Sequence, residues 1–169
     1  MKDTTPIYFH SATYAHEHGE LDQYHASHKA NVACREAIEQ AIADNYRDNR
    51  LDPACVQQVL QQFDYGRIFY VLANTVRQKD HDGRISRDNK AWAQTVPVCE
   101  DKDGFGYDRN VYFAVDRCNP GLTDLFLSQA RRECAPAQEQ KPSVRDSLNK
   151  NAGQQAHSDR TKAKKEPER

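Results

Sequence analysis

The sequence predicts a mainly α-helical fold: a compact domain of five to six helices with at most a small two- or three-stranded β element. Apolar residues recur at helical spacing through most of residues 21–134, and helix-capping residues precede several of these segments. The composition changes at Pro136, after which Lys, Gln, Ser and Pro dominate and no aromatic residue occurs. We therefore expect a helical globular domain over residues 1–135 and a disordered, mildly basic tail over 136–169.

Composition narrows the class of protein. The 169 residues favour one domain plus an appendage, and the mean hydropathy of -0.97 is low for a chain that is globular throughout. Residues 136–169 carry eight Lys and Arg against five Asp and Glu, so a net charge of +3 in the tail leaves -4 for residues 1–135. The total of -1 neither favours nor excludes a polyanionic partner.

The first elements follow from capping residues and periodicity. Residues 6–10 can form a short strand, and Ser11 resembles the N-cap of a short helix that Gly19 ends. A long helix is predicted over about residues 21–47, with alanines that allow a neighbouring helix to approach closely. Residues 49–52 then form a turn, and Asp52-Pro53 starts the next helix.

The central prediction is a helix over residues 65–79, capped by Asp64. Its apolar side chains cover more of the helical wheel than one face requires, so it should be packed on two sides. A turn over residues 80–83 follows, and Ser86 caps another helix that ends near Thr95.

The remaining body contains the best strand candidate. Residues 99–110 read as a loop, and residues 111–115 as a strand that pairs with residues 6–10 or with residues 96–98. A last helix opens at Leu122 or Thr123 and ends near Cys134. In the tail, Val144 and Leu148 stand four residues apart and can form a small helix on a partner, although an inert solvated tail is the simpler interpretation.

Metal sites and reactive thiols are weakly supported. Asp80, Asp82 and Gly83 copy the middle of a calcium loop, but Gln78 and Asn89 replace two ligands, which favours a plain turn. The pair His25 and His28 lacks an identifiable third ligand for zinc. The five cysteines are scattered without a CxxC motif, which is typical of reduced thiols in a cytoplasmic protein.

No motif predicts a reaction, a cofactor or a membrane span. A Gly-rich phosphate loop, a GxSxG elbow and an HExxH helix are absent from the sequence, as is any apolar run of about 18 residues. We therefore predict no catalytic residue, no metal ligand and no cofactor, and we expect a non-enzymatic protein.

Two polar strips lie on predicted helices. Arg67, Tyr70, Asn74 and Arg77 form a narrow line opposite the apolar face of the central helix. His28, Asn31 and Arg35 lie within the apolar side of the long helix. The strips can bond each other as a structural polar seam, since buried polar groups need partners, or the first strip can be an exposed recognition surface. A small-ligand pocket is the third interpretation. The candidate interaction residues are Arg67, Tyr70, Asn74, Arg77, Arg84, Lys90 and Trp92.

Several runs of residues resemble a known family. They are Tyr24, His28, Ala30, Asn31 and Cys34, residues 48–52 (DNRLD), residues 70–76 (YVLANTV), residues 82–86 (DGRIS), residues 88–93 (DNKAWA) and residues 119–122 (NPGL). Together they are similar to an uncharacterised bacterial domain family carried by integrative and conjugative elements of gut bacteria. Residues 141–145 (KPSVR) are similar to tails found beside such modules. The resemblance implies a setting in horizontally transferred DNA, but no activity and no site residues.

That setting orders three hypotheses. The first is a protein-interaction module of a mobile element, acting on a host defence nuclease (anti-CRISPR or anti-restriction type) or serving element transfer. The second is a nucleic-acid-binding accessory protein of conjugation or element maintenance. It would bind phosphates through Arg67, Arg77, Arg84, Arg87, Lys90 and the basic tail. The third is an enzyme whose site is too distributed to recognise in sequence.

Overall fold

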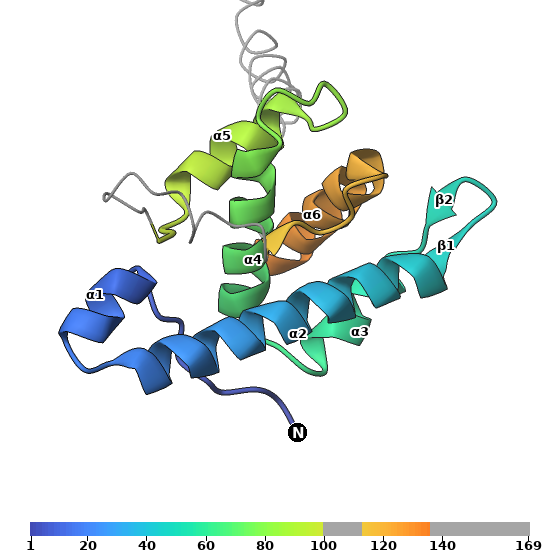
Figure 1. Ribbon diagram of the computed structural model, residues 1–169. Helices are drawn as coiled ribbons and strands as arrows, with labels where there is room; N and C mark the ends of the chain where they lie inside the picture. Colours follow the sequence, from blue (N-terminus) through green and yellow to red (C-terminus); the bar gives the residue numbers. More distant parts are fainter. Residues whose placement is uncertain (100–112, 136–169) are drawn as a thin grey trace, which may run out of the picture. The chain divides into compact units, whose positions relative to one another are not determined.

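The computed structural model describes residues 1–99 and 113–135, which contain six helices and one small antiparallel sheet (Figure 1). The helices are α1 (Ala12–Glu17), α2 (Leu21–Asn45), α3 (Ala54–Leu60), α4 (Tyr65–Gln78), α5 (Arg87–Thr95) and α6 (Pro120–Cys134). The strands are β1 (Tyr46–Arg47) and β2 (Arg50–Leu51), and residues Met1–Cys134 form one compact unit. The predicted mainly helical class with a small β element is confirmed.

Three predicted caps start helices as expected. The side chain of Ser11 accepts from the backbone N–H of Tyr14 at 3.1 Å, and that of Asp64 accepts from Arg67 at 2.8 Å. Ser86 Oγ accepts from the N–H of Asn89 at 3.3 Å. Each bond satisfies one of the amides that the first helical turn leaves without an intrahelical acceptor.

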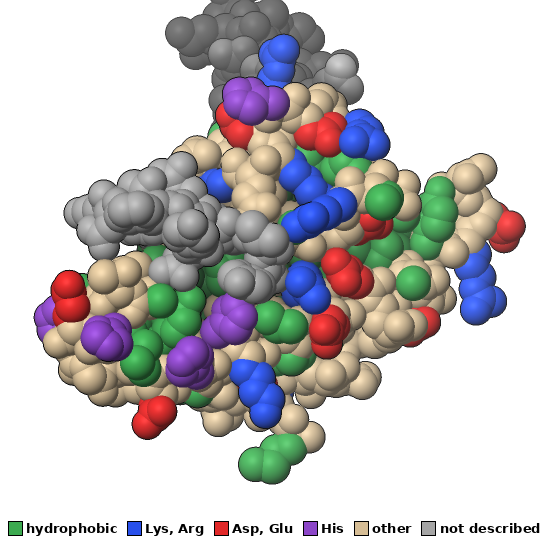
Figure 2. Space-filling view, viewed as in Figure 1, with side chains coloured by type: hydrophobic (Ala, Val, Ile, Leu, Met, Phe, Trp, Pro, Cys, Tyr) green, Lys and Arg blue, Asp and Glu red, His purple; other side chains and the backbone are tan. Residues whose placement is uncertain are grey.

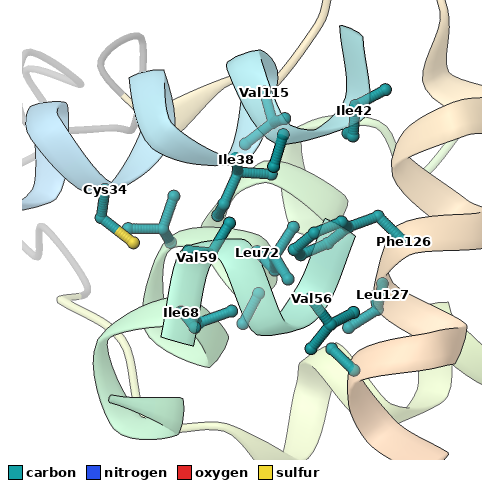
Figure 3. Packing of buried hydrophobic residues seen from close by; sticks show 14 of the residues in the cluster. Cys34, Ile38, Ile42, Val56, Val59, Ile68, Leu72, Val115, Phe126 and Leu127 are labelled. Carbon is teal, nitrogen blue, oxygen red and sulfur yellow. The ribbon is translucent and has the colours of Figure 1, made fainter. Parts of the chain in front are cut away.

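Helix α4 is buried over most of its surface because it packs against both α2 and α5. Figure 3 shows how side chains from three helices meet in the core: Ile38 from α2, Leu72 from α4 and Phe126 from α6. Each of these side chains is fully buried. Burial of an aliphatic or aromatic side chain of this size contributes about 1.5–3 kcal/mol. The two-sided burial predicted from the apolar width of this helix is therefore present.

The two predicted strands are wrong where the structure describes them. Residues 6–10 form no strand, and residues 113–115 form none either; residues 111 and 112 lie outside the described part. The backbone of 113–115 is bonded by side chains instead, since Thr75 Oγ1 donates to the carbonyl of Phe113 and accepts from the N–H of Val115. Hydroxyl groups of the core thus replace a neighbouring strand, and burial decides the conformation over β-propensity.

The actual sheet is a hairpin where only a turn was expected. Asp48 and Asn49 both adopt positive φ, at 52° and 59°, and link the paired residues Arg47 and Arg50. Two positive φ values in a two-residue loop match the twist of a tight hairpin. Because Tyr46 and Arg47 enter this hairpin, α2 ends at Asn45 rather than at Arg47.

Helix α6 begins two residues earlier than predicted. Pro120 is its first residue, where a missing N–H costs nothing because first-turn amides have no intrahelical acceptor. None of the described helices is both long and apolar enough to cross a membrane. The predicted loop over 99–110, apart from Cys99, and the predicted tail over 136–169 lie outside the described residues.

Candidate functional site

The polar strip of α4 lies mostly inside the protein. Arg67 is 3% exposed and Asn74 is 0% exposed, and Tyr70 is buried as well. These three side chains contact other parts of the same chain, so they form no surface in this structure. Of the seven candidate interaction residues, Arg84 is exposed, while Arg77, Lys90 and Trp92 are half-buried.

Arg67 joins three segments of the chain. Its Nη1 donates to the Asn31 side chain and, at 3.3 Å, to both the carbonyl and the hydroxyl of Ser27. Its Nη2 donates to the carbonyl of Thr5. All these acceptors are neutral, and within the described ranges no carboxylate forms an ion pair with this guanidinium. Burial lowers the pKa of Arg67.

The predicted polar seam is therefore present in one pair of its residues, Arg67 and Asn31. The other two residues of the α2 strip point to different neighbours. His28 stacks on Tyr24 with ring centroids 6.1 Å apart, and Arg35 pairs with Glu36 at 3.5 Å.

Tyr70 lies between two other aromatic rings. It makes edge-to-face contacts with Phe9 at 5.5 Å and with Phe113 at 5.6 Å. Burial raises the pKa of Tyr70 to about 12, so its hydroxyl stays protonated. The Asn74 side chain donates to the carbonyl of Tyr70 at 2.7 Å, while its Oδ1 has no hydrogen-bond partner among the residues described.

Arg77 holds the end of α5. Its guanidinium donates to the carbonyls of Ala93 at 3.0 Å, Gln94 at 3.4 Å and Val96 at 3.1 Å. The last carbonyls of a helix lack intrahelical donors and carry partial negative charge, so an arginine there is favourable. The interaction ties α4 to the C-terminal turn of α5.

A second polar network joins α5 to α6. The Asn89 side chain donates to the carbonyl and carboxylate of Asp124 at 3.2 and 2.7 Å and to the Ser128 hydroxyl at 2.9 Å. Its own oxygen accepts from Arg131 at 2.6 Å, and the Arg131 guanidinium lies 5.6 Å from the ring centroid of Trp92. Trp92 thereby becomes part of the packing between helices.

The calcium-like turn is occupied by its own arginine. Arg84 donates to both carboxylate oxygens of Asp82, at 3.0 and 2.9 Å. These hydrogen bonds lower the pKa of Asp82 to about 2. Among the described residues, no group of three His, Cys, Asp or Glu side chains is placed to hold a metal ion.

A small pocket opens where the N-terminal segment crosses α2 and α4. Its lining from the N-terminal segment and α2 comprises Tyr8, His10, Tyr24, Ser27, His28 and Asn31. The rest of its lining comprises Tyr70, Cys99 and Phe113. The space open to the centre of a water-sized molecule is about 20 Å³, enough for about one water. We call it the Ser27–Asn31 pocket.

The pocket was not predicted as a unit from the sequence. Its residues come from segments as distant as Tyr8 and Phe113, and no local spacing relates them. The one signal was the polar pair of His28 and Asn31 within an otherwise apolar helix side. That pair indicated a special environment without naming the partners.

Exposed rings gather beside this pocket. His10 stacks on Tyr14 at 4.2 Å between ring centroids, and Tyr14 stacks on His18 at 3.8 Å. Phe9 is 44% exposed and Tyr14 37% exposed. Figure 2 shows histidine side chains over α1 and the adjoining end of α2. We call Phe9, His10, Tyr14 and His18 the α1 face.

Comparison with known proteins identifies a family without a function. A family model described as "Protein of unknown function (DUF3849)" matches residues 7–135, which include every described helix. No curated protein and no solved structure matches the chain.

Proposed function

We propose that this chain, which belongs to the DUF3849 family, is a non-enzymatic protein-interaction module. The observation that carries the proposal is the α1 face, where aromatic and imidazole rings are stacked at the surface. Exposed large rings are uncommon without a role, and tyrosine is enriched in the residues that dominate binding energy at interfaces. The rings are also pre-ordered by stacking, which reduces the entropy lost on binding.

Charge favours a protein partner over a nucleic acid at this face. Binding to nucleic acid depends on Lys and Arg near phosphates. Residues 1–30 contain the cations Lys2 and Lys29 against the acids Asp3, Glu17, Glu20 and Asp22. This segment has no arginine and a net charge of -2 with neutral histidines, which opposes a phosphate backbone.

The finer proposal concerns the setting. The sequence resembles modules of integrative and conjugative elements, so we propose a host defence nuclease or a component of the transfer machinery as the partner. Inhibition of a nuclease requires only a stable complex, which an interaction face without a catalytic site can form.

The test is affinity capture with the full chain from a bacterial lysate. The double substitution Tyr14→Ala and His18→Ala should reduce the captured protein by about tenfold or more, since hot-spot side chains carry about 2 kcal/mol or more each. Tyr46→Ala and Leu125→Ala remove comparably exposed side chains elsewhere and should leave capture unchanged.

The competing nucleic-acid hypothesis predicts a different result. Capture that disappears after nuclease treatment, or that falls steeply from about 50 to about 200 mM salt, would contradict the protein-interaction proposal. In that case Arg84→Ala with Lys90→Ala should weaken binding and the α1-face substitutions should not.

A further inference from the structure

We propose that the Ser27–Asn31 pocket binds a carboxylate group, supplied by a small free acid or by an acidic side chain of a partner. The proposal rests on the hydrogen-bonding state of the groups that line the pocket and on the buried charge behind them. It does not depend on the role of the α1 face.

Ser27 offers the pocket a donor and no acceptor. Its hydroxyl oxygen accepts from the backbone N–H of Tyr8 at 2.9 Å and from Arg67 at 3.3 Å. A serine hydroxyl has two lone pairs and one hydrogen, so both acceptor positions are used. The remaining O–H can only donate, and a group that lacks acceptors cannot satisfy it.

Asn31 has the same character. Its Oδ1 accepts from Arg67, which leaves the two hydrogens of Nδ2. None of the described residues offers Nδ2 an acceptor, and Asn31 lines the pocket although the residue is only 3% exposed. An amide donor in this position requires an acceptor inside the pocket, because a buried unsatisfied donor is costly.

The charge behind these two residues favours an anion. Arg67 bonds only to neutral oxygens, and the carboxylates of Asp3 and Asp64 act on it from beyond ion-pair distance. A buried cation without a directly paired anion is strongly attracted to negative charge in its low-dielectric surroundings. A carboxylate in the pocket would accept from Ser27 and Asn31 and offset the charge of Arg67 through them.

The other charged and titratable groups do not reverse this preference. Glu20 is already bonded by the Tyr8 hydroxyl at 2.7 Å. His10 and His28 line the pocket and can donate through a ring nitrogen. The hydroxyl of Tyr70 stays protonated because burial raises its pKa to about 12.

The size of the pocket limits the ligand to a small head group. About 20 Å³ for the centre of a water-sized molecule accommodates one or two oxygen atoms but no sugar or base. A planar carboxylate meets this limit and provides several lone pairs for the converging donors. Water also fits, and it is the occupant that the experiment must distinguish.

The experiment is an NMR titration of the full-length, ¹⁵N-labelled chain with sodium acetate, using sodium chloride at equal ionic strength as the reference. Acetate should produce saturable shifts of the Asn31 side-chain amide and the Ser27 backbone amide, with a Kd on the order of 1 mM for so small a ligand. A peptide with one blocked glutamate serves as the second arm. Shifts with both ligands support a carboxylate from either source, and shifts with acetate alone assign a free acid.

Asn31→Asp is the decisive variant. It keeps an acceptor for Arg67 but replaces the amide donor with negative charge, so acetate affinity should fall by at least about tenfold while the fold is retained. Gln23→Glu adds the same charge on the exposed side of α2 and should change affinity little. If Asn31→Asp does not fold, Ser27→Ala, which removes one donor, should weaken acetate binding instead.

Three results would overturn the proposal. One is the absence of saturable shifts with acetate, which would mean that the pocket holds only water. Another is an equal response to chloride, and the last is acetate binding unchanged by Asn31→Asp or by Ser27→Ala.

Discussion

Arg67 on α4 donates to the side-chain oxygen of Asn31 on α2, so two helices 36 residues apart in the sequence are joined by one buried guanidinium. The same group holds Thr5 and Ser27, which ties the N-terminal segment to the helical core. Its role in this structure is to unite three segments, and the pocket beside it inherits its charge.

Replacing this guanidinium should destabilise the whole domain. Arg67→Met preserves much of the side-chain volume but leaves the acceptors of Asn31, Ser27 and Thr5 without their donor. We expect the free energy of unfolding to fall by about 3 kcal/mol in urea denaturation, since each buried orphan costs about 1–3 kcal/mol. Arg87→Met, at an exposed position on α5, is the control and should change stability by less than about 0.5 kcal/mol.

The network around Asn89 should be comparably sensitive. Asn89→Ala removes hydrogen bonds to Asp124, Ser128 and Arg131, and should lower the free energy of unfolding by about 3 kcal/mol. The exposed residue Gln94 provides a matched Ala substitution on the same helix, expected to be close to neutral. A neutral Asn89→Ala would mean that water replaces the lost bonds.

Arg77 should act locally at α5. Arg77→Ala deprives the carbonyls of Ala93, Gln94 and Val96 of a charged donor, with a loss of about 1–2 kcal/mol. Hydrogen exchange should accelerate at the amides of the last turn of α5 more than at those of α3. Uniform acceleration in both helices would contradict a local capping role. Arg47→Ala, on the exposed hairpin, is the control.

Alkaline pH should destabilise the fold through Cys34. Burial raises the pKa of this thiol above its usual value of 9.0, so the folded chain keeps the proton while the unfolded chain releases it. The stability from the protonated thiol is complete below about pH 9 and is lost as pH rises toward the folded pKa. In urea denaturation from pH 7 to pH 10, Cys34→Ala should therefore reduce the alkaline slope of the unfolding free energy. Cys118→Ala, at an exposed position, should keep the slope of the parent chain.

The α4 strip illustrates the limit of helical-wheel reasoning. The wheel placed Arg67, Tyr70, Asn74 and Arg77 on one line, and they do share a side of the helix. It could not decide whether that side meets solvent, because a second helix can cover a polar line when it brings matching acceptors. Here the N-terminal segment and α2 supply those acceptors to Arg67, and the end of α5 supplies them to Arg77.

Local chemistry in the sequence determined the helices. Ser11, Asp64 and Ser86 cap because a short polar side chain reaches its own helix's first amides, which requires no distant partner. The breadth of the apolar face of α4 likewise determined that it would be buried on two sides.

Only the tertiary structure decided the rest. Residues 113–115 have strand-like composition, yet the hydroxyl of Thr75 and the surrounding core bind them as irregular backbone. The Ser27–Asn31 pocket and the pairing of Arg67 with Asn31 depend on contacts between segments far apart in the chain. Such contacts depend on which surfaces meet when the core forms, and no spacing along one helix contains that information.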